Sequence, residues 1–114
     1  MSEGVSRALP QRKSELTPTE QELVIMCQRT NFGRMRNLVI RGGQPVFDPP
    51  PVIQRDHKFG GQNGPRAESG LDDFVLKQEF VDLLRRMREI GDGTIVNLEI
   101  RAGKPFMMTE EAAA

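Results

Sequence analysis

GTIVNLEIRAGKPF, residues 93–106, decides the fold, because a close copy of it, GRMRNLVIRGGQPV, occupies residues 33–46. The two stretches align without a gap at a constant offset of 60 positions and are identical at seven of them. A helix-like run precedes each copy. The sequence therefore predicts a unit of helix, glycine stop, strand, glycine turn and strand that occurs twice.

The bulk composition limits the classes of protein that fit. The 114 residues suit one domain, and 16 basic side chains balance 16 acidic ones, so no overall field favours nucleic acid or membrane. The single cysteine, Cys27, excludes an internal disulfide and indicates a reducing, cytoplasmic setting. No apolar run is long enough to span a bilayer, and residues 1–7 lack the apolar core of a secretion signal.

The chain divides by composition. The polar, aperiodic residues 1–15 predict a flexible tail. Residues 48–70 contain three consecutive prolines and four glycines, which predict an irregular connector. The remaining bounds are a single domain at 16–108, repeats within it at 16–47 and 71–108, and a short tail at 109–114.

The first helix has a strong start signal. Thr17 can cap it, Pro18 fits the first helical position, and Glu20 completes a capping box. An end is expected near residues 31–33, where Asn or Gly accepts the left-handed conformation. The second helix is predicted from an apolar stripe at spacings of three and four, with Asp72 or Ser69 as its cap. The stripe consists of Leu76, Phe80, Leu83, Leu84, Met87 and Ile90.

The strands are predicted from alternation and from their turns. Alternation places Arg36, Leu38 and Ile40 on one face of the first strand. Because alanine at position 102 disfavours a positive φ, a three-residue loop with one left-handed glycine is expected in both hairpins. Prolines at positions 45 and 105 cannot donate to a ladder, so the return strands should lie at sheet edges. These elements predict an α+β fold with an antiparallel four-stranded sheet covered by two helices.

Chemistry-bearing residues are few. Cys27 falls on an apolar helix stripe, which favours a buried inert thiol over a nucleophile. His57 is the only histidine, so a metal site of several His or Cys ligands cannot be built. The glycine-rich segment 58–66 lacks the Gly-Lys-Ser/Thr ending of a phosphate-binding loop. The sequence therefore predicts a protein that is not an enzyme and that uses no metal or cofactor.

Charge differs between the two copies. Four arginines, namely Arg29, Arg34, Arg36 and Arg41, fall in thirteen residues without an acid. The equivalent stretch 89–101 holds one cation, Arg101, and three acids. A solvated strand face is the simplest interpretation. Beyond it, the contrast favours association with a protein partner or with a second copy. The alternative is contact with nucleic acid through these arginines together with Lys58 and Arg66.

Polar residues also repeat on the strands. Asn37 and Asn97 correspond, as do Arg41 and Arg101. Local backbone hydrogen bonding is the favoured interpretation, and a duplicated binding groove is the alternative.

One further pattern carries a resemblance. Residues 80–84 (FVDLL), 90–95 (IGDGTI) and 100–105 (IRAGKP) are similar to a family of short uncharacterised bacterial proteins, a domain of unknown function. Members show a leucine-rich helix, a Gly-Ser/Thr-Ile/Val step, a strand and a glycine turn. The resemblance covers residues 80–106, and more loosely 20–47, where Arg34 replaces the Ser/Thr. It implies a helix–hairpin fold and a bacterial cytosol, and it brings no activity with it.

Together these observations favour a non-catalytic small adaptor or regulatory protein. It would bind a protein partner or itself through sheet edges or the outward strand face, without a membrane contact. A nucleic-acid-binding accessory protein using the basic first hairpin is the alternative.

Overall fold

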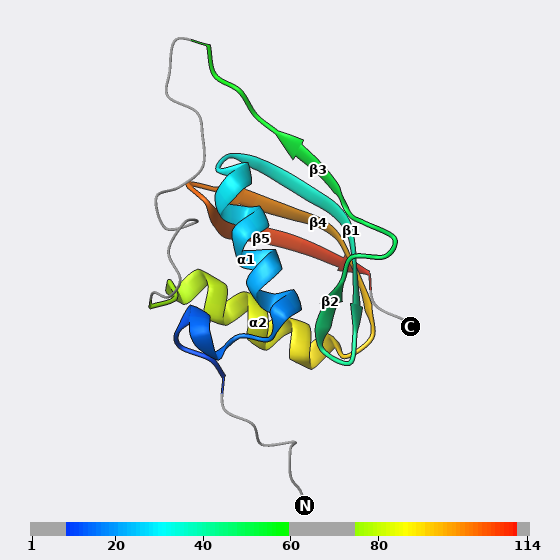
Figure 1. Cartoon of the computed structure of the whole chain (residues 1–114). Helices are drawn as coiled ribbons and strands as arrows, with labels where there is room; N and C mark the ends of the chain where they lie inside the picture. The colour runs from blue at the N-terminus through cyan, green and yellow to red at the C-terminus, as the bar shows by residue number, and fades with distance from the viewer. Residues whose placement is uncertain (1–8, 60–74, 112–114) are drawn as a thin grey trace, which may run out of the picture.

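The computed structural model describes residues 9–59 and 75–111. They form an α+β fold in which two helices cover one face of a five-stranded antiparallel sheet (Figure 1). The helices are α1 (Pro18–Thr30) and α2 (Gln78–Ile90), preceded by a short 3-10 helix at Lys13–Glu15. The strands are β1 (Gly33–Arg41), β2 (Gln44–Val46), β3 (Val52–Arg55), β4 (Gly93–Arg101) and β5 (Lys104–Glu111).

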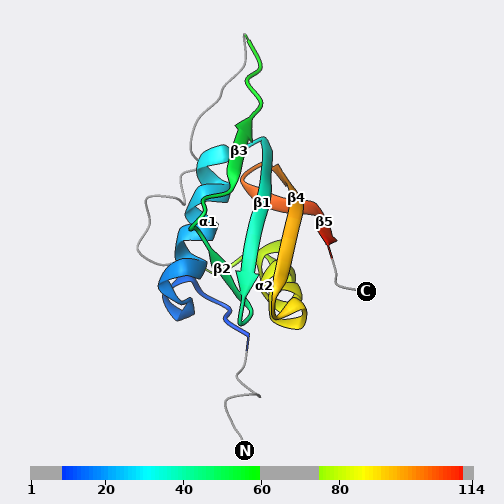
Figure 2. The ribbon, with the colours of Figure 1, turned by 90° about the vertical axis from the view of Figure 1, so that its right-hand side faces the viewer.

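The sheet is built around β1 and β4, which pair antiparallel at its centre (Figure 2). β5 flanks β4, while β2 and β3 share the other flank of β1. The expectation of four strands is corrected to five, because β3 lies within the predicted connector and pairs with β1 residues 33–36. Pro45 and Pro105 do lie in edge strands, as their missing N–H requires.

The core lies between the helices and the covered sheet face. Both helices point their apolar side chains into it, and the predicted stripe on α2 is buried from Phe80 to Met87. Leu76 is buried as well, although it precedes the helix, whose N-cap is Lys77. The cap candidates Ser69 and Asp72 lie outside the described residues. At α1 the predicted capping box is confirmed, since the Thr17 side chain accepts from the Glu20 N–H and the Glu20 carboxylate accepts from the Thr17 N–H.

The folded part of the described chain extends beyond the predicted domain limits on both sides. Arg12 forms a bridge with Val75, and Leu76 N–H donates to the Gln11 carbonyl at 2.9 Å. Residues 9–15 therefore belong to the folded part and not to a tail. β5 likewise continues to Glu111, past the expected end at residue 108.

The alternation predicted for β1 is wrong at Arg36. Met35 and Leu38 are both buried, with exposed Arg36 and Asn37 between them. Asn37 has a φ of 62°, in the left-handed region that Asn tolerates better than most residues. The irregularity moves Arg36 to the uncovered face and brings Leu38 back to the core. In β4, Ile95 and Leu98 are buried at the same spacing.

The turns also differ from the expectation. Arg41 pairs with Gln44 and Arg101 with Lys104, so each hairpin has a two-residue loop. Both loop residues have positive φ, including Ala102 at 53°. This is the primed turn whose twist matches that of the flanking strands, and that match outweighs the strain at an alanine.

Each hairpin turn contacts the end of the helix from the other half of the chain. Gly43 N–H donates to the Gly91 carbonyl at 2.8 Å, and Gly103 N–H donates to the Asn31 carbonyl at 2.8 Å. Gly91 and Asn31 are the C-caps of α2 and α1. These bonds satisfy carbonyls that a helix end leaves without intrahelical partners.

Candidate functional site

The edge of the sheet formed by β5 presents an unusual surface. Among the described residues, β5 pairs with β4 alone, so the backbone groups along its outer side have no strand partner. Two of its large apolar side chains are exposed, Phe106 by 55% and Met107 by 57%. An edge strand with exposed apolar side chains is suited to accept another chain.

An open groove of about 230 Å³ runs between α2 and β5. Its apolar lining comes from Leu83 of α2, Leu98 of β4 and residues 105–108 of β5. Three charged residues of α2 complete it, namely Glu79, Asp82 and Arg86. We call the outer side of β5 and this groove together the β5 surface. The apolar floor with charged residues at its side is typical of a binding groove.

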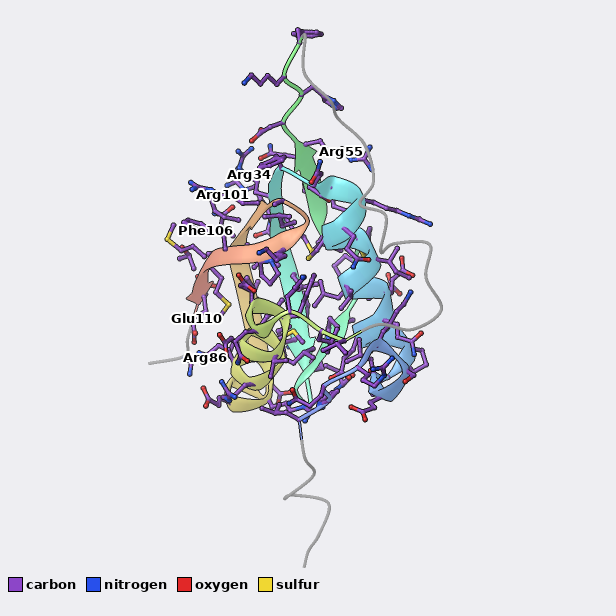
Figure 3. The ribbon with its side chains drawn as sticks, turned by 90° about the vertical axis from the view of Figure 1, so that its left-hand side faces the viewer. Arg34, Arg55, Arg86, Arg101, Phe106 and Glu110 are labelled. Atoms are coloured by element: carbon purple, nitrogen blue, oxygen red, sulfur yellow. The ribbon has the colours of Figure 1, made fainter. Side chains whose placement is uncertain are left out.

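Two ion pairs connect α2 to the ends of β5. The Arg86 guanidinium donates to both carboxylate oxygens of Glu110, at 2.6 and 2.7 Å (Figure 3). Those bonds hold the pKa of Glu110 below its ordinary value and raise the pKa of Arg86. At the other end, Lys104 Nζ lies 3.3 Å from the Glu79 carboxylate. The pKa of Glu79 is lowered by a hydrogen bond from its own backbone N–H and then by Lys104. These exposed pairs fix the groove's geometry more than they stabilise the fold.

A cation contacts the exposed ring of Phe106. The Arg101 guanidinium carbon lies 3.9 Å from the centre of the Phe106 ring, which is a cation–π geometry. A second hollow, beside Arg101, Lys104 and Phe106, continues the groove toward the hairpin turn. Figure 3 shows Arg101 and Phe106 side by side near Arg34.

The predicted basic residues do not form one cluster. Arg34 and Arg36 lie on the uncovered face of β1, and Arg34 is paired with Asp56 at 3.3 Å. Arg41 donates to its neighbour's carbonyl at the far end of that strand. Arg29 belongs to the last turn of α1, in the helix layer. Lys58 is exposed beyond β3, and Arg66 lies outside the described residues.

The residues of each repeated polar pair, Asn37 and Asn97 or Arg41 and Arg101, make different contacts in the structure. Asn37 marks the irregular step in β1, and Asn97 pairs opposite Arg36 and Thr109 in the sheet. Arg41 and Arg101 stand before the two turns, but only Arg101 contacts an aromatic ring. A duplicated groove does not appear among them in the described part of the chain.

The two side chains considered for catalysis, Cys27 and His57, lie in different parts of the structure. Cys27 is buried, and desolvation raises the pKa of its thiol to about 12, which leaves it protonated. His57 is exposed beyond β3. Residues 9–59 and 75–111 contain no group of three acidic, His or Cys side chains placed to hold a metal ion.

The β5 surface was missed in the sequence because its residues resemble core residues. Phe106, Met107 and Met108 are three consecutive apolar residues. A strand with one buried face should alternate, so such a run was the available signal for exposed apolar side chains. Arg86 and Glu110 lie 24 positions apart, and no local pattern connects them.

Within the described ranges, neither helix has the length and hydropathy that a bilayer crossing requires. Comparison with protein-family models, with curated proteins and with solved structures gave no match to this chain.

Proposed function

We propose that this chain is a non-catalytic adaptor or regulatory protein that binds a protein partner, or a second copy, along the β5 surface. The observation that carries the proposal is the pair of exposed apolar side chains, Phe106 and Met107, on an edge strand beside an open apolar groove. A cytoplasmic setting belongs to the same proposal, and the free buried Cys27 supports it.

The physical case begins with the edge. A strand added to β5 gains backbone hydrogen bonds along residues 107–111, past Pro105 and the shift in register at Phe106, and alternate side chains enter the groove. Covering the exposed halves of Phe106 and Met107 contributes on the order of 1 kcal/mol each, which is enough to bias association toward this edge. The cation–π contact with Arg101 keeps the ring presented before a partner arrives, which reduces the ordering cost of binding.

The charged side chains of the groove favour binding over catalysis. Arg86 with Glu110 and Lys104 with Glu79 are opposite charges already in contact. A general acid or base needs a carboxyl held in an apolar pocket with its pKa raised toward neutrality. The pKa shifts of Glu79 and Glu110 have the opposite direction.

We also propose that the chain comprises two copies of one helix–hairpin unit, each completing the other. Support comes from the β1–β4 register, in which Gly33 lies opposite Ile100 and Gly93 lies opposite Ile40. Adding 60 to the number of Gly33 gives Gly93, and subtracting 60 from that of Ile100 gives Ile40, so exchanging the two units turns one pair into the other, as a two-fold relation between them requires. The two reciprocal bonds from hairpin turn to helix C-cap follow the same relation.

Site-directed photo-crosslinking tests the proposed function. Benzoylphenylalanine replaces Met107 in β5, and in a control it replaces Val52, which is 52% exposed in β3 at the opposite edge. Irradiation in the source cell should give a crosslinked protein adduct from position 107 and none from position 52. An absence of adduct at 107, or equal adducts at both positions, would refute the proposed surface.

A second candidate function is contact with nucleic acid through the uncovered sheet face. Arg34, Arg36 and Arg101 on neighbouring central strands favour it, and the Phe106 ring beside Arg101 offers a stacking surface. Glu99 and Asp56 reduce the positive charge there. Binding of a single-stranded oligonucleotide that weakens steeply with salt, and that is lost in Arg36→Glu, would support this candidate.

A further inference from the structure

One methionine of the β5 surface is open to oxidising agents. Met107 is 57% exposed in β5, beside the exposed ring of Phe106, and it lines the groove between α2 and β5. We propose that Met107 is a modification site, at which a peroxide converts the thioether to a sulfoxide, and that this oxidation releases the partner from the β5 surface. The inference rests on the proposed function and names a regulation of its surface.

Sulfur atoms elsewhere in the described residues are shielded. The remaining methionines there pack in the core or against it, namely Met26, Met35, Met87 and Met108. Cys27 is fully buried, and desolvation raises the pKa of its thiol to about 12, so the thiol stays protonated at neutral pH. Oxidants react with thiolates and with accessible thioethers. Within residues 9–59 and 75–111, Met107 is therefore the sulfur site that an oxidant reaches first.

The sheet separates Met107 from its neighbour in the chain. Met107 lies opposite Glu99 in β4. Met108 lies opposite Leu98, which is buried, so the two thioethers are on different faces of β5. An oxygen atom added to Met107 meets solvent and leaves the packing of the core unchanged. Oxidation at this position therefore alters the surface without unfolding the chain.

The oxidation is a two-electron reaction in which an oxygen atom is transferred. With hydrogen peroxide, a lone pair of the Met107 sulfur attacks one oxygen and the O–O bond breaks. The departing hydroxide takes up the proton, so the products are methionine sulfoxide and water. A methionine sulfoxide reductase reverses the change, because two thiols give a disulfide while the sulfoxide oxygen leaves as water. The modification is therefore reversible, as regulation requires.

The sulfoxide weakens the surface as a binding site. Covering the exposed part of the Met107 thioether favours association, and a polar sulfoxide loses that contribution. Its oxygen is also a hydrogen-bond acceptor, and burying it under a partner without a donor has a further cost in free energy. Together these effects should weaken partner binding by at least about fivefold.

Peptide mapping of the purified full chain tests the site. The chain is treated with hydrogen peroxide under native conditions, and fragmentation in the mass spectrometer between positions 107 and 108 locates the added oxygen. We expect Met107 to be oxidised at least about tenfold faster than Met35 and Met87, which react only when the fold opens. Met108 should also react more slowly, and the circular dichroism should stay unchanged. Oxidation of Met108 as fast as that of Met107, or unfolding when Met107 is oxidised, would overturn the inference.

Photo-crosslinking in the source cell tests the consequence for binding. Benzoylphenylalanine replaces Thr109, an exposed residue two positions along β5 on the same face as Met107. A pulse of hydrogen peroxide before irradiation should lower the yield of adduct by about fivefold relative to untreated cells. In a Met107→Leu background, which has no thioether at this position, treated and untreated cells should give equal yields. Met107→Gln, whose amide imitates the polarity of the sulfoxide, should give a low yield without peroxide.

The possible results separate this inference from the proposed function. An adduct that forms equally with and without peroxide in the parent background overturns the regulation and leaves the β5 surface standing as a binding site. An equal fall in the Met107→Leu background assigns the effect to another oxidised group and also overturns the regulation. Absence of any adduct from positions 107 and 109 in untreated cells overturns the proposed function and the inference together.

Discussion

Replacing Gly33 by Ala should detach β3 from the sheet while leaving the core intact. Gly33 lies in β1 opposite Arg55, with a φ of 156°. A methyl group there would overlap the Gln54 carbonyl oxygen and approach the Arg55 Cα to 3.0 Å. Both atoms belong to the backbone of β3, so neither can rotate away. The strand must move as a whole.

The expected loss of stability is the free-energy cost of the less costly of two structural responses, namely keeping β3 in place or releasing it. Keeping β3 in place would compress backbone against backbone in a strained conformation. Releasing β3 gives up its backbone pairing with β1 over four residues. The four β3 side chains are all exposed, so their release uncovers little apolar surface. With about 1 kcal/mol net for each backbone hydrogen bond and some chain entropy regained, the loss is about 2–3 kcal/mol. For a chain of this size that corresponds to a Tm lower by about 10 °C.

The control is Gly42→Ala in the first turn. Gly42 has a φ of 58° and open space around its Cβ position. Ala102 occupies the equivalent place in the second turn at a φ of 53°, so the geometry accepts alanine. We expect a loss of about 1 kcal/mol or less.

Amide hydrogen exchange by NMR checks the prediction, with melting followed by circular dichroism. In Gly33→Ala, the amides of β3 and the Asp56 N–H, which donates to the Phe32 carbonyl at 2.7 Å, should lose protection. The β4–β5 amides should keep theirs. Unchanged protection in β3, or loss spread evenly over the sheet, would refute this account of Gly33.

Three further predictions concern the core, a helix cap and a buried thiol. Leu38→Asp and Leu98→Asp should each unfold the chain, since both side chains are fully buried and an unpaired carboxylate there costs several kcal/mol; a circular-dichroism melt like that of the parent would contradict it. Thr17→Ala should lower the free energy of unfolding by about 1 kcal/mol in urea titrations through loss of the α1 cap. Burial raises the pKa of Cys27 from 9.0 to about 12, so the unfolded chain ionises first and stability should fall as the pH rises from 9 toward 12. Melts at about pH 8 and about pH 10 should show the fall in the parent and less of it in Cys27→Ala.

Local signals were sufficient where the physics is local. The start of α1 follows from Thr17, Pro18 and Glu20 alone, because a capping box is complete within four residues. The stripe on α2 follows from the helical period. Both elements form where the sequence predicts them, although α2 begins later than its stripe suggests.

Other features depend on contacts that no local pattern contains. Ala102 adopts a positive φ because the twist of the whole hairpin favours a primed turn over the preference of one residue. β3 forms because Gly33 admits a neighbouring backbone, and its own four residues bury nothing. Phe106 and Met107 are neighbours that are both exposed because the β4–β5 register shifts between Glu99 and Ile100, which is a property of the pairing of two strands.

The reciprocal bonds between turns and helix ends also bear on how the chain acquires its shape during synthesis. The first helix–hairpin leaves the ribosome before the residues that will pair with β1 and satisfy the Asn31 carbonyl have been made. Its apolar faces stay uncovered until β4, about sixty positions later in the chain, has been synthesised. Such distant pairing slows folding and prolongs the time in which a nascent chain is open to chaperones or to misassembly. A chain truncated after the first half would keep these apolar faces uncovered, because it would lack β4.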